Sequence, residues 1–170
     1  MAELITHCAT GKADLDTVRS LCWEYRDHLI AHSDRERRVV EAFYPIASYT
    51  DLMDRLAELY AAPLGAILLA RLDGKAVGCG MFHCILPRMA EIKRLYVQPA
   101  ARGNGVGRML CEGLMDTART AGFNRVVLNT SKSLASARAL YAKLSFTECD
   151  PFYRVPPEAE DLLCFYERPL

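Results

Sequence analysis

The chain has 170 residues, of which 51% are hydrophobic and 25% charged, an ordinary globular composition. Its 21 basic and 21 acidic residues cancel, which argues against a nucleic-acid partner because nucleic-acid-binding domains are usually basic. No apolar run approaches the roughly 20 residues that a membrane-spanning helix needs, so we expect no membrane partner. The length favours one domain over residues 1–170.

The N-terminal part of the chain predicts one strand and two helices. Glu3–Cys8 has the character of a short strand, and apolar residues at steps of three and four from Leu15 to Leu29 predict a helix. The run Asp34–Arg38 mixes both signs of charge and breaks this pattern, so we expect a solvated connection there. A second helix is predicted over Tyr49–Ala61 from its row of leucines.

Strands dominate the middle of the chain. Ala66–Leu72 and Ala76–Ile85 are apolar runs joined through Asp73-Gly74, a pair typical of a tight hairpin, and Ala90–Val97 predicts a further strand. The remaining predicted elements are helices over Val106–Ala121 and Ser133–Leu144, strands over Arg125–Asn129, Phe146–Cys149 and Leu162–Glu167, and a loop over Asp150–Glu160. Antiparallel strands followed by alternating strands and helices predict an α/β or α+β sheet with helices packed on it.

Two patterns bear on redox state and on metals. The seven cysteines are odd in number, irregularly spaced and without a CxxC pair, which argues against disulfides and zinc motifs and favours reduced thiols in the cytoplasm. Glu24, His28 and His32 stand four residues apart on one face of the first helix, and two histidines at that spacing can bind zinc. Since no third ligand motif accompanies them, we expect a polar helix face and no metal.

The segment with the most chemical information is Arg102-Gly103-Asn104-Gly105-Val106-Gly107-Arg108. It joins a predicted strand to a predicted helix, where free N–H groups and the helix dipole favour an anion such as phosphate. A P-loop would need Lys-Ser or Lys-Thr after its last glycine, and a dinucleotide fingerprint needs a different glycine spacing and a later acidic residue. A tight glycine-rich turn without a ligand is the alternative.

Two segments resemble signatures of the GNAT superfamily of acyl-CoA-dependent N-acetyltransferases. The first is Arg102–Gly107, where the family has Gln or Arg, two residues, Gly, one residue, and Gly or Ala. The second is Ala137–Phe146, which is similar to the family's helix that carries Leu-Tyr and runs into Gly-Phe. The resemblance implies a mixed, mostly antiparallel sheet of six or seven strands, splayed between the fourth and fifth strands and flanked by about four helices.

The resemblance also implies a site for acetyl-CoA as co-substrate. In the family, a bulge after the fourth strand leaves backbone groups free to pair with the pantetheine arm, which places the main chain of Leu95 and Val97 against it. The residues expected around the pyrophosphate are Arg102, Gly103, Asn104, Gly105, Gly107 and Arg108. The alternative for the side chains of Arg102 and Arg108 is that they are simply solvated.

Two catalytic roles are implied by the resemblance, each with a structural alternative. Tyr141 stands where the family has the acid that protonates the departing thiolate, although its place on the apolar stripe of a helix also suits simple packing. Glu91 is the candidate base, acting through water, although a glutamate at a strand end is more often exposed. The candidates for contact with the acceptor are Glu24, Tyr25, His28 and Tyr49.

Two positions depart from the family's pattern. Leu134 stands where many members have an asparagine that contacts the cofactor, and Ser145 stands where glycine usually precedes Phe146. Serine resists a positive φ, which puts the backbone conformation at the end of this helix in question. Neither departure removes a reacting group.

The sequence therefore predicts an N-acetyltransferase that moves the acetyl group of acetyl-CoA directly to the amine of a small molecule. Two alternatives stay open: a domain that binds acyl-CoA without catalysis, and an enzyme that acetylates protein N-termini or lysines. The oligomeric state, including a homodimer, stays open as well.

Overall fold

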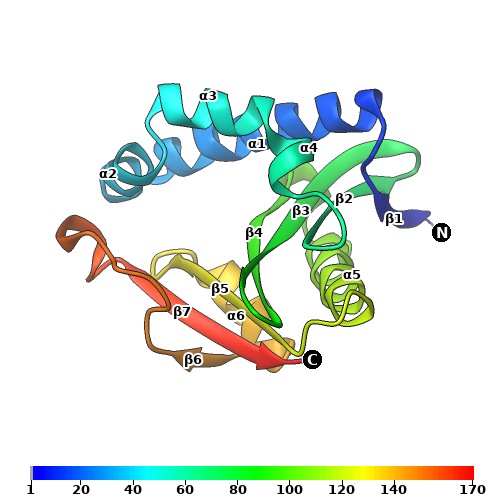
Figure 1. The fold of residues 1–170 in the computed structure, drawn as a ribbon. Coiled ribbons are helices and arrows are strands. Elements are labelled where there is room, and N and C mark those ends of the chain that lie inside the picture. The colour runs from blue at the N-terminus through cyan, green and yellow to red at the C-terminus, as the bar shows by residue number, and fades with distance from the viewer. Residues whose placement is uncertain (1) are drawn as a thin grey trace.

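The computed structural model describes residues 2–170, and a mixed sheet forms its centre (Figure 1). The strands lie in the order β1-β2-β3-β4-β5-β7-β6, in which β4 and β5 are parallel and the other neighbours antiparallel. Their bounds are β1 Leu4–Cys8, β2 Gly65–Leu72, β3 Lys75–Leu86, β4 Met89–Val97, β5 Arg125–Ser131, β6 Thr147–Cys149 and β7 Leu163–Pro169. The predicted fold class is confirmed.

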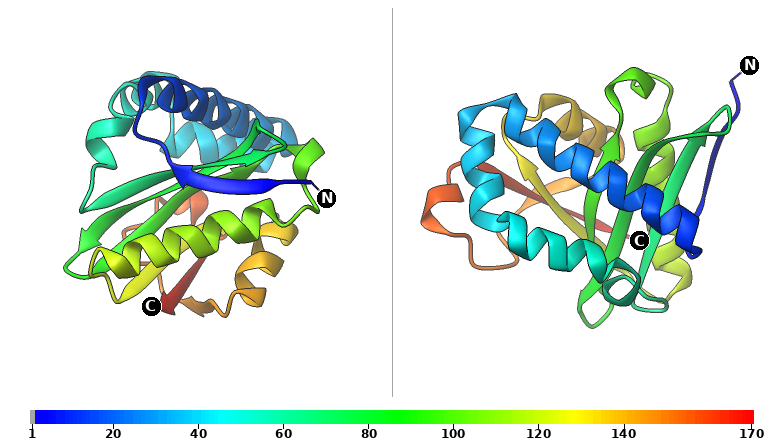
Figure 2. Two further views of the ribbon diagram at one scale, coloured as in Figure 1. Left: turned by 90° about the vertical axis from the view of Figure 1, so that its right-hand side faces the viewer. Right: turned by 90° about the horizontal axis from the view of Figure 1, so that it is seen from above.

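Helices cover both faces of the sheet. One apolar cluster joins α1 and α3 to one face, and a second joins α5 to the other, as Figure 2 shows. The helices of residues 2–170 are α1 Lys12–His32, α2 Asp34–Phe43, α3 Ile46–Asp54, α4 Leu56–Leu59, α5 Val106–Thr120 and α6 Ala135–Lys143, with short 3-10 helices at Pro99–Ala101 and Pro157–Ala159. The sequence analysis expected about four. One reason for the larger number is a break at Arg55, which divides the helix predicted over Tyr49–Ala61 into α3 and α4.

The prediction of a solvated connection at Asp34–Arg38 is wrong, because these residues form the first half of α2. Ser33 caps this helix, and its hydroxyl accepts a hydrogen bond from the backbone N–H of Glu36 at 3.1 Å. Glu36 and Val40 are buried one turn apart, while the neighbouring charges face solvent. The charge run therefore forms a helix in which one carboxylate, that of Glu36, is buried.

The hairpin between β2 and β3 forms as predicted. Asp73 and Gly74 have φ angles of 49° and 78°, the positive values that a two-residue type I′ turn requires at both central positions. Further along β3, α5 crosses the sheet very closely at Gly78. A Cβ at that position would lie 2.7 Å from the carbonyl oxygen of Tyr96 and 3.2 Å from Cδ1 of Leu110, so a side chain does not fit there.

The sheet opens between β4 and β5, as the resemblance implied. The two strands pair only over Met89–Glu91 and Arg125–Val127, and beyond these pairs they diverge (Figure 1). β5 remains paired with β7 along its whole length, from Arg125 to Ser131. The outer half of β4 thus has one strand neighbour, β3, and one open edge.

Candidate active site

A bulge in β4 changes the direction of its side chains at the open edge. Cys79 lies opposite Tyr96 and Met81 opposite Lys93. The two pairs are therefore three residues apart along β4 but only two apart along β3. Arg94 in this bulge has a φ of 50°, rare for a residue with a side chain. The resemblance implied a bulge after the strand, whereas the structure has it inside β4.

The backbone of Leu95 and Val97 faces the open edge. The N–H of Gln98 donates to the carbonyl oxygen of Val77 in β3 at 2.9 Å, and polar groups of successive strand residues point in alternate directions. Leu95 and Val97 therefore turn their N–H and C=O groups away from β3. The carbonyl oxygen of Val97 accepts a hydrogen bond from Nε of Arg102 at 3.2 Å, which is consistent with this direction.

The glycine loop leads directly into the N-terminus of α5. Gly103 and Gly105 have φ angles of 84° and 78°, and a Cβ added at either position would meet no atom within 4 Å. Gly105 is the N-cap, and within residues 2–170 no side chain caps this helix. The first N–H groups of α5 thus lack intrahelical partners in a loop with open space around it, the arrangement that binds a phosphate group.

Side chains of the loop are held in different ways. The amide of Asn104 donates back to the carbonyl oxygen of Ala101 at 3.1 Å, which shapes the turn. Arg108 pairs with Glu112 one turn along α5 at 2.9 Å. Arg102 also donates to Nε2 of His28 on α1 at 3.1 Å. Burial and the charge of Arg102 lower the pKa of His28, in keeping with a neutral imidazole that accepts this bond.

Tyr141 lies on α6 and reaches the space between the diverging strands. Its ring is 6% exposed and packs against the rings of Phe146 and Tyr166, with centroids 5.7 and 5.8 Å away. Burial raises the pKa of Tyr141 well above its usual range, so the phenol stays protonated. Within residues 2–170 its hydroxyl forms no hydrogen bond. The residue is both packed, as the alternative had it, and available as a proton donor.

The turn after α6 keeps the backbone conformation that glycine usually provides. Ser145 adopts a φ of 62°. The N–H of Phe146 donates to the carbonyl oxygen of Tyr141 at 3.0 Å, and that of Ser145 donates to Ala142 at 3.1 Å. This pair of bonds is a Schellman motif. Serine at this position therefore does not change the end of the helix that carries Tyr141.

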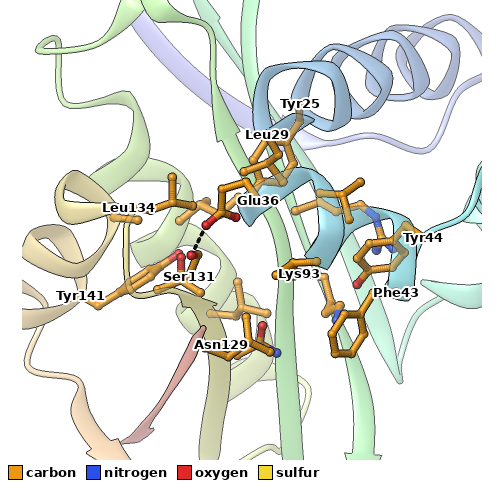
Figure 3. Close-up of a pocket in the computed structure, with 18 of the residues that line it drawn as sticks. Tyr25, Leu29, Glu36, Phe43, Tyr44, Lys93, Asn129, Ser131, Leu134 and Tyr141 are labelled. Carbon is orange, nitrogen blue, oxygen red and sulfur yellow. Dashed lines mark hydrogen bonds between the residues drawn. The ribbon is translucent and has the colours of Figure 1, made fainter. Parts of the chain in front are cut away.

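A cavity of about 130 Å³ lies between the two strands and the N-terminal helices (Figure 3). Tyr25 and Leu29 line it from α1, and Tyr141 lines it from α6. Its further lining residues include Glu36, Phe43, Tyr44, Lys93, Arg94, Leu95, Ser131 and Leu134. Candidate residues from three separate parts of the chain, Tyr25, Leu95 and Tyr141, thus meet at one cavity.

Glu36 lines this cavity from α2 and was missed in the sequence. Glu36 is only 2% exposed. Its Oε1 accepts hydrogen bonds from the hydroxyls of Ser131 and Ser133, the latter at 2.7 Å. In the part of the chain that the structure describes, Glu36 has no basic partner within 4.0 Å. The sequence signal for α2 was a serine that can cap a helix, Ser33, followed by an apolar residue at Val40, and this helix buries Glu36.

Arg94 is a buried cation at the same cavity. It is 8% exposed, and its Nη1 donates to the hydroxyl of Tyr60 at 2.6 Å. The rings of Tyr44 and Tyr49 lie 5.3 and 5.8 Å from its guanidinium carbon. Its Nε is buried without a hydrogen-bond partner, and no carboxylate of residues 2–170 lies within 4.0 Å of it.

Glu91, the predicted base, is held by two basic groups. It is 6% exposed, and it accepts hydrogen bonds from Nε2 of His83 at 2.9 Å and from Nζ of Lys93 at 3.2 Å. Burial alone would raise the pKa of Glu91, but these partners outweigh it and lower the pKa below its usual value. Glu91 lies outside the lining of the cavity, in the last residue pair before β4 and β5 part.

The four acceptor candidates of the N-terminal helices separate in the structure. Tyr25 lines the cavity, and burial raises its pKa to about 12. Glu24 instead accepts hydrogen bonds from the hydroxyl of Tyr96 at 2.8 Å and from the amide of Gln98 at 2.9 Å. His28 contacts the glycine loop as described above. The hydroxyl of Tyr49 donates to the carbonyl oxygen of Cys22, which makes it part of the core.

The fold and the site together define an acyltransferase, and the comparisons with known proteins name the family. Residues 17–146 match the model of the acetyltransferase (GNAT) family. The chain is 37% identical to the IAA acetyltransferase of Azospirillum brasilense over 134 residues, which cover 78% of this chain and 84% of that protein. The chain therefore belongs to the GNAT family of acetyltransferases.

Solved structures show the same fold. An acetyltransferase from Streptococcus agalactiae superposes with a TM-score of 0.71 at 22% identity, covering 98% of both chains. The yncA protein of Salmonella typhimurium, solved with its cofactor acetyl-CoA, gives a TM-score of 0.67 at 21% identity over 98% of this chain and 94% of that one. In residues 2–170, no group of three or more His, Cys, Asp or Glu side chains is arranged to hold a metal. No helix there combines the length and apolar character needed to cross a membrane.

Proposed function

We propose that this chain transfers an acetyl group from acetyl-CoA directly to the amine of a small molecule. The observation that carries the proposal is the meeting of Leu95, on the open edge of β4, and the phenol of Tyr141 at one cavity. The uncapped N-terminus of α5 follows the same strand through the glycine loop. The strand edge and the helix N-terminus suit an extended, anionic donor, and the phenol suits a leaving group that needs a proton.

The residues present fit acetyl-CoA along its length. The main chain of Leu95 and Val97 would pair with the pantetheine arm. The loop from Arg102 to Arg108, with Gly103, Asn104, Gly105 and Gly107, would surround the pyrophosphate with N–H groups. Val97 would exchange its bond from Arg102 for one from the pantetheine arm, and Arg102 would then be free for the phosphates. When bound, acetyl-CoA supplies an activated acetyl thioester.

Each step of the transfer has a candidate group in the chain. The N–H of Leu95, which points into the opening, would stabilise the oxyanion that forms on the acetyl carbonyl. The protonated phenol of Tyr141 would give its proton to the departing thiolate. Glu91 remains the base implied by the resemblance. It would act through water, and it would have to loosen a bond from His83 or Lys93 to do so.

The small volume of the cavity favours a small acceptor over a polypeptide. The cavity measures about 130 Å³ and is roofed by α1 and α2, which leave room for a compact amine. All seven cysteines carry free thiols, which supports a cytoplasmic enzyme. We take residues 1–170 as one acetyltransferase domain that needs no metal.

The direct test is thiol release from acetyl-CoA with a broad panel of small amines. We expect release with a subset of the panel, and we expect Tyr141→Phe to lower kcat by about 10²- to 10⁴-fold. Tyr166→Phe is the matched control, because this tyrosine lies beside Tyr141 but outside the cavity. CoA binding without any thiol release would favour a non-catalytic domain. Labelled acetyl groups on proteins of a lysate, and not on small molecules, would favour a protein acetyltransferase.

A further inference from the structure

Two buried charges of opposite sign line the acceptor cavity without a partner. Glu36 enters it from α2 and Arg94 from the bulge of β4, and they are 2% and 8% exposed. In residues 2–170 neither group has an ionic partner within 4.0 Å, and they do not pair with each other. By contrast, the buried carboxylate of Glu91 has two basic partners.

Unpaired buried charges are costly, because their loss of hydration is not repaid by a counter-charge. Oε1 of Glu36 accepts hydrogen bonds from two serine hydroxyls, and Nη1 of Arg94 donates one to the hydroxyl of Tyr60, so each charge is only partly satisfied. The buried Nε of Arg94 has no partner at all in the described residues. A ligand with both a positive and a negative group would neutralise the charges of both Glu36 and Arg94.

We infer that the acceptor is an amine that also carries a carboxylate, as an amino acid does, held by Glu36 at its ammonium and by Arg94 at its carboxylate. This inference rests on the proposed function, since it names the class of amine that the same cavity takes. Lys93 adds a second positive group on the carboxylate side, 20% exposed and next to Arg94 on β4. The aromatic rings of Tyr25, Phe43 and Tyr44 leave an apolar wall for the rest of the acceptor.

The same pairing prepares the nitrogen for attack. An ammonium has no free electron pair, so one N–H bond must break before the nitrogen reaches the acetyl carbonyl. Glu36 accepts that first proton, and the nitrogen keeps the electron pair. After the C–N bond has formed, the C–S bond breaks and the thiolate gains a proton from Tyr141. The nitrogen gives its second proton through water to Glu91, from which Tyr141 is reprotonated, and Glu36 releases its proton to solvent. The net products are the N-acetyl compound, CoA and one released proton.

The test compares the 20 common amino acids with their carboxamides, in which the amine is kept and the negative charge removed. Thiol release and calorimetric binding in the presence of CoA are both measured. For the best acceptor we expect the acid to exceed its carboxamide by about 30-fold in kcat/KM and in affinity, as befits a buried ion pair. Equal values for acid and carboxamide would overturn the inference and leave the proposed function intact. Absence of thiol release with every amine would instead overturn the proposed function, while binding would still decide the preference for a carboxylate.

Variants assign the two charges. Arg94→Met should abolish the preference for the acid over the carboxamide, and Arg94→Lys should keep part of it, with exposed Arg38→Met as the control. Glu36→Gln keeps an oxygen for the two serines, and it should lower kcat and weaken amine binding, whereas Glu41→Gln on the exposed side of the same helix should not. If Arg94→Met does not fold, Arg94→Lys and the comparison of each amino acid with its carboxamide on the wild-type chain still test the preference for a carboxylate. An undiminished preference in Arg94→Met together with unchanged kcat in Glu36→Gln would show that both residues only stabilise the fold.

Discussion

The substitution Ser145→Gly should stabilise the protein, because it relieves backbone strain at the end of α6. Ser145 is exposed and has a φ of 62°. A residue with a Cβ in this left-handed region costs about 1–2 kcal/mol. Glycine adopts it freely, but it loses about 0.5–1 kcal/mol more conformational entropy on folding. The difference is a gain of about 0.5–1 kcal/mol in the free energy of unfolding.

Thermal and urea unfolding measure this gain. For a chain of this length, 1 kcal/mol corresponds to about 2–4 °C in Tm, so we expect a rise of about 1–4 °C. Ser145→Ala is the matched control, because it removes the hydroxyl but keeps the Cβ and therefore the strain. Its stability should stay within about 0.5 kcal/mol of the wild type. A loss of stability in Ser145→Gly, or an equal gain in Ser145→Ala, would refute the strain argument. Activity should not change, since Tyr141 is held by the same Schellman bonds.

Three further substitutions probe the elements around the site. Ser33→Ala should destabilise the protein by about 1 kcal/mol in urea unfolding through loss of the α2 cap, with Ser48→Ala as a control, because Ser48 caps no helix. Gly78→Ala should cost about 1–3 kcal/mol, because the new Cβ would lie 2.7 Å from the carbonyl oxygen of Tyr96, and an unchanged Tm would contradict this close approach. Glu91→Gln should cost about 1–3 kcal/mol at pH 7, because its two basic partners lose their carboxylate. Since the folded pKa of Glu91 is lowered, that stabilisation is present above the unfolded pKa near 4.3 and disappears as the pH falls through the folded pKa, so the two proteins should converge in acid.

The sequence predicted those parts of the site that depend on local pattern. The glycines at 103 and 105 indicate positive φ angles and a close ligand, and the structure has both angles. The strand, loop and helix around them follow from hydrophobic period, and the helix over Ser133–Leu144 follows from the same kind of signal. These features were accessible because each depends on neighbours within about ten residues along the chain.

The two charged walls of the cavity could not be predicted in this way. Glu36 stands in a run where most charges are solvated, and only the packing of α2 against β5 decides which one is buried. Arg94 faces the cavity because β4 contains an extra residue relative to β3, and a bulge reverses the direction that simple alternation assigns. Both outcomes depend on contacts between segments that lie far apart in the sequence.

The unpaired edge of β4 has a consequence for self-association. Free strand edges offer rows of N–H and C=O groups that can recruit a strand from another chain and begin aggregation. Here the edge lies within the sheet, and it converges on β5 at Met89–Glu91, where the two strands reach hydrogen-bonding separation. An added strand could not follow the edge through that narrow end, and the carbonyl of Val97 at the wide end is covered by Arg102. The fold therefore keeps a row of backbone groups ready for a slender ligand without exposing a seed for β-aggregation.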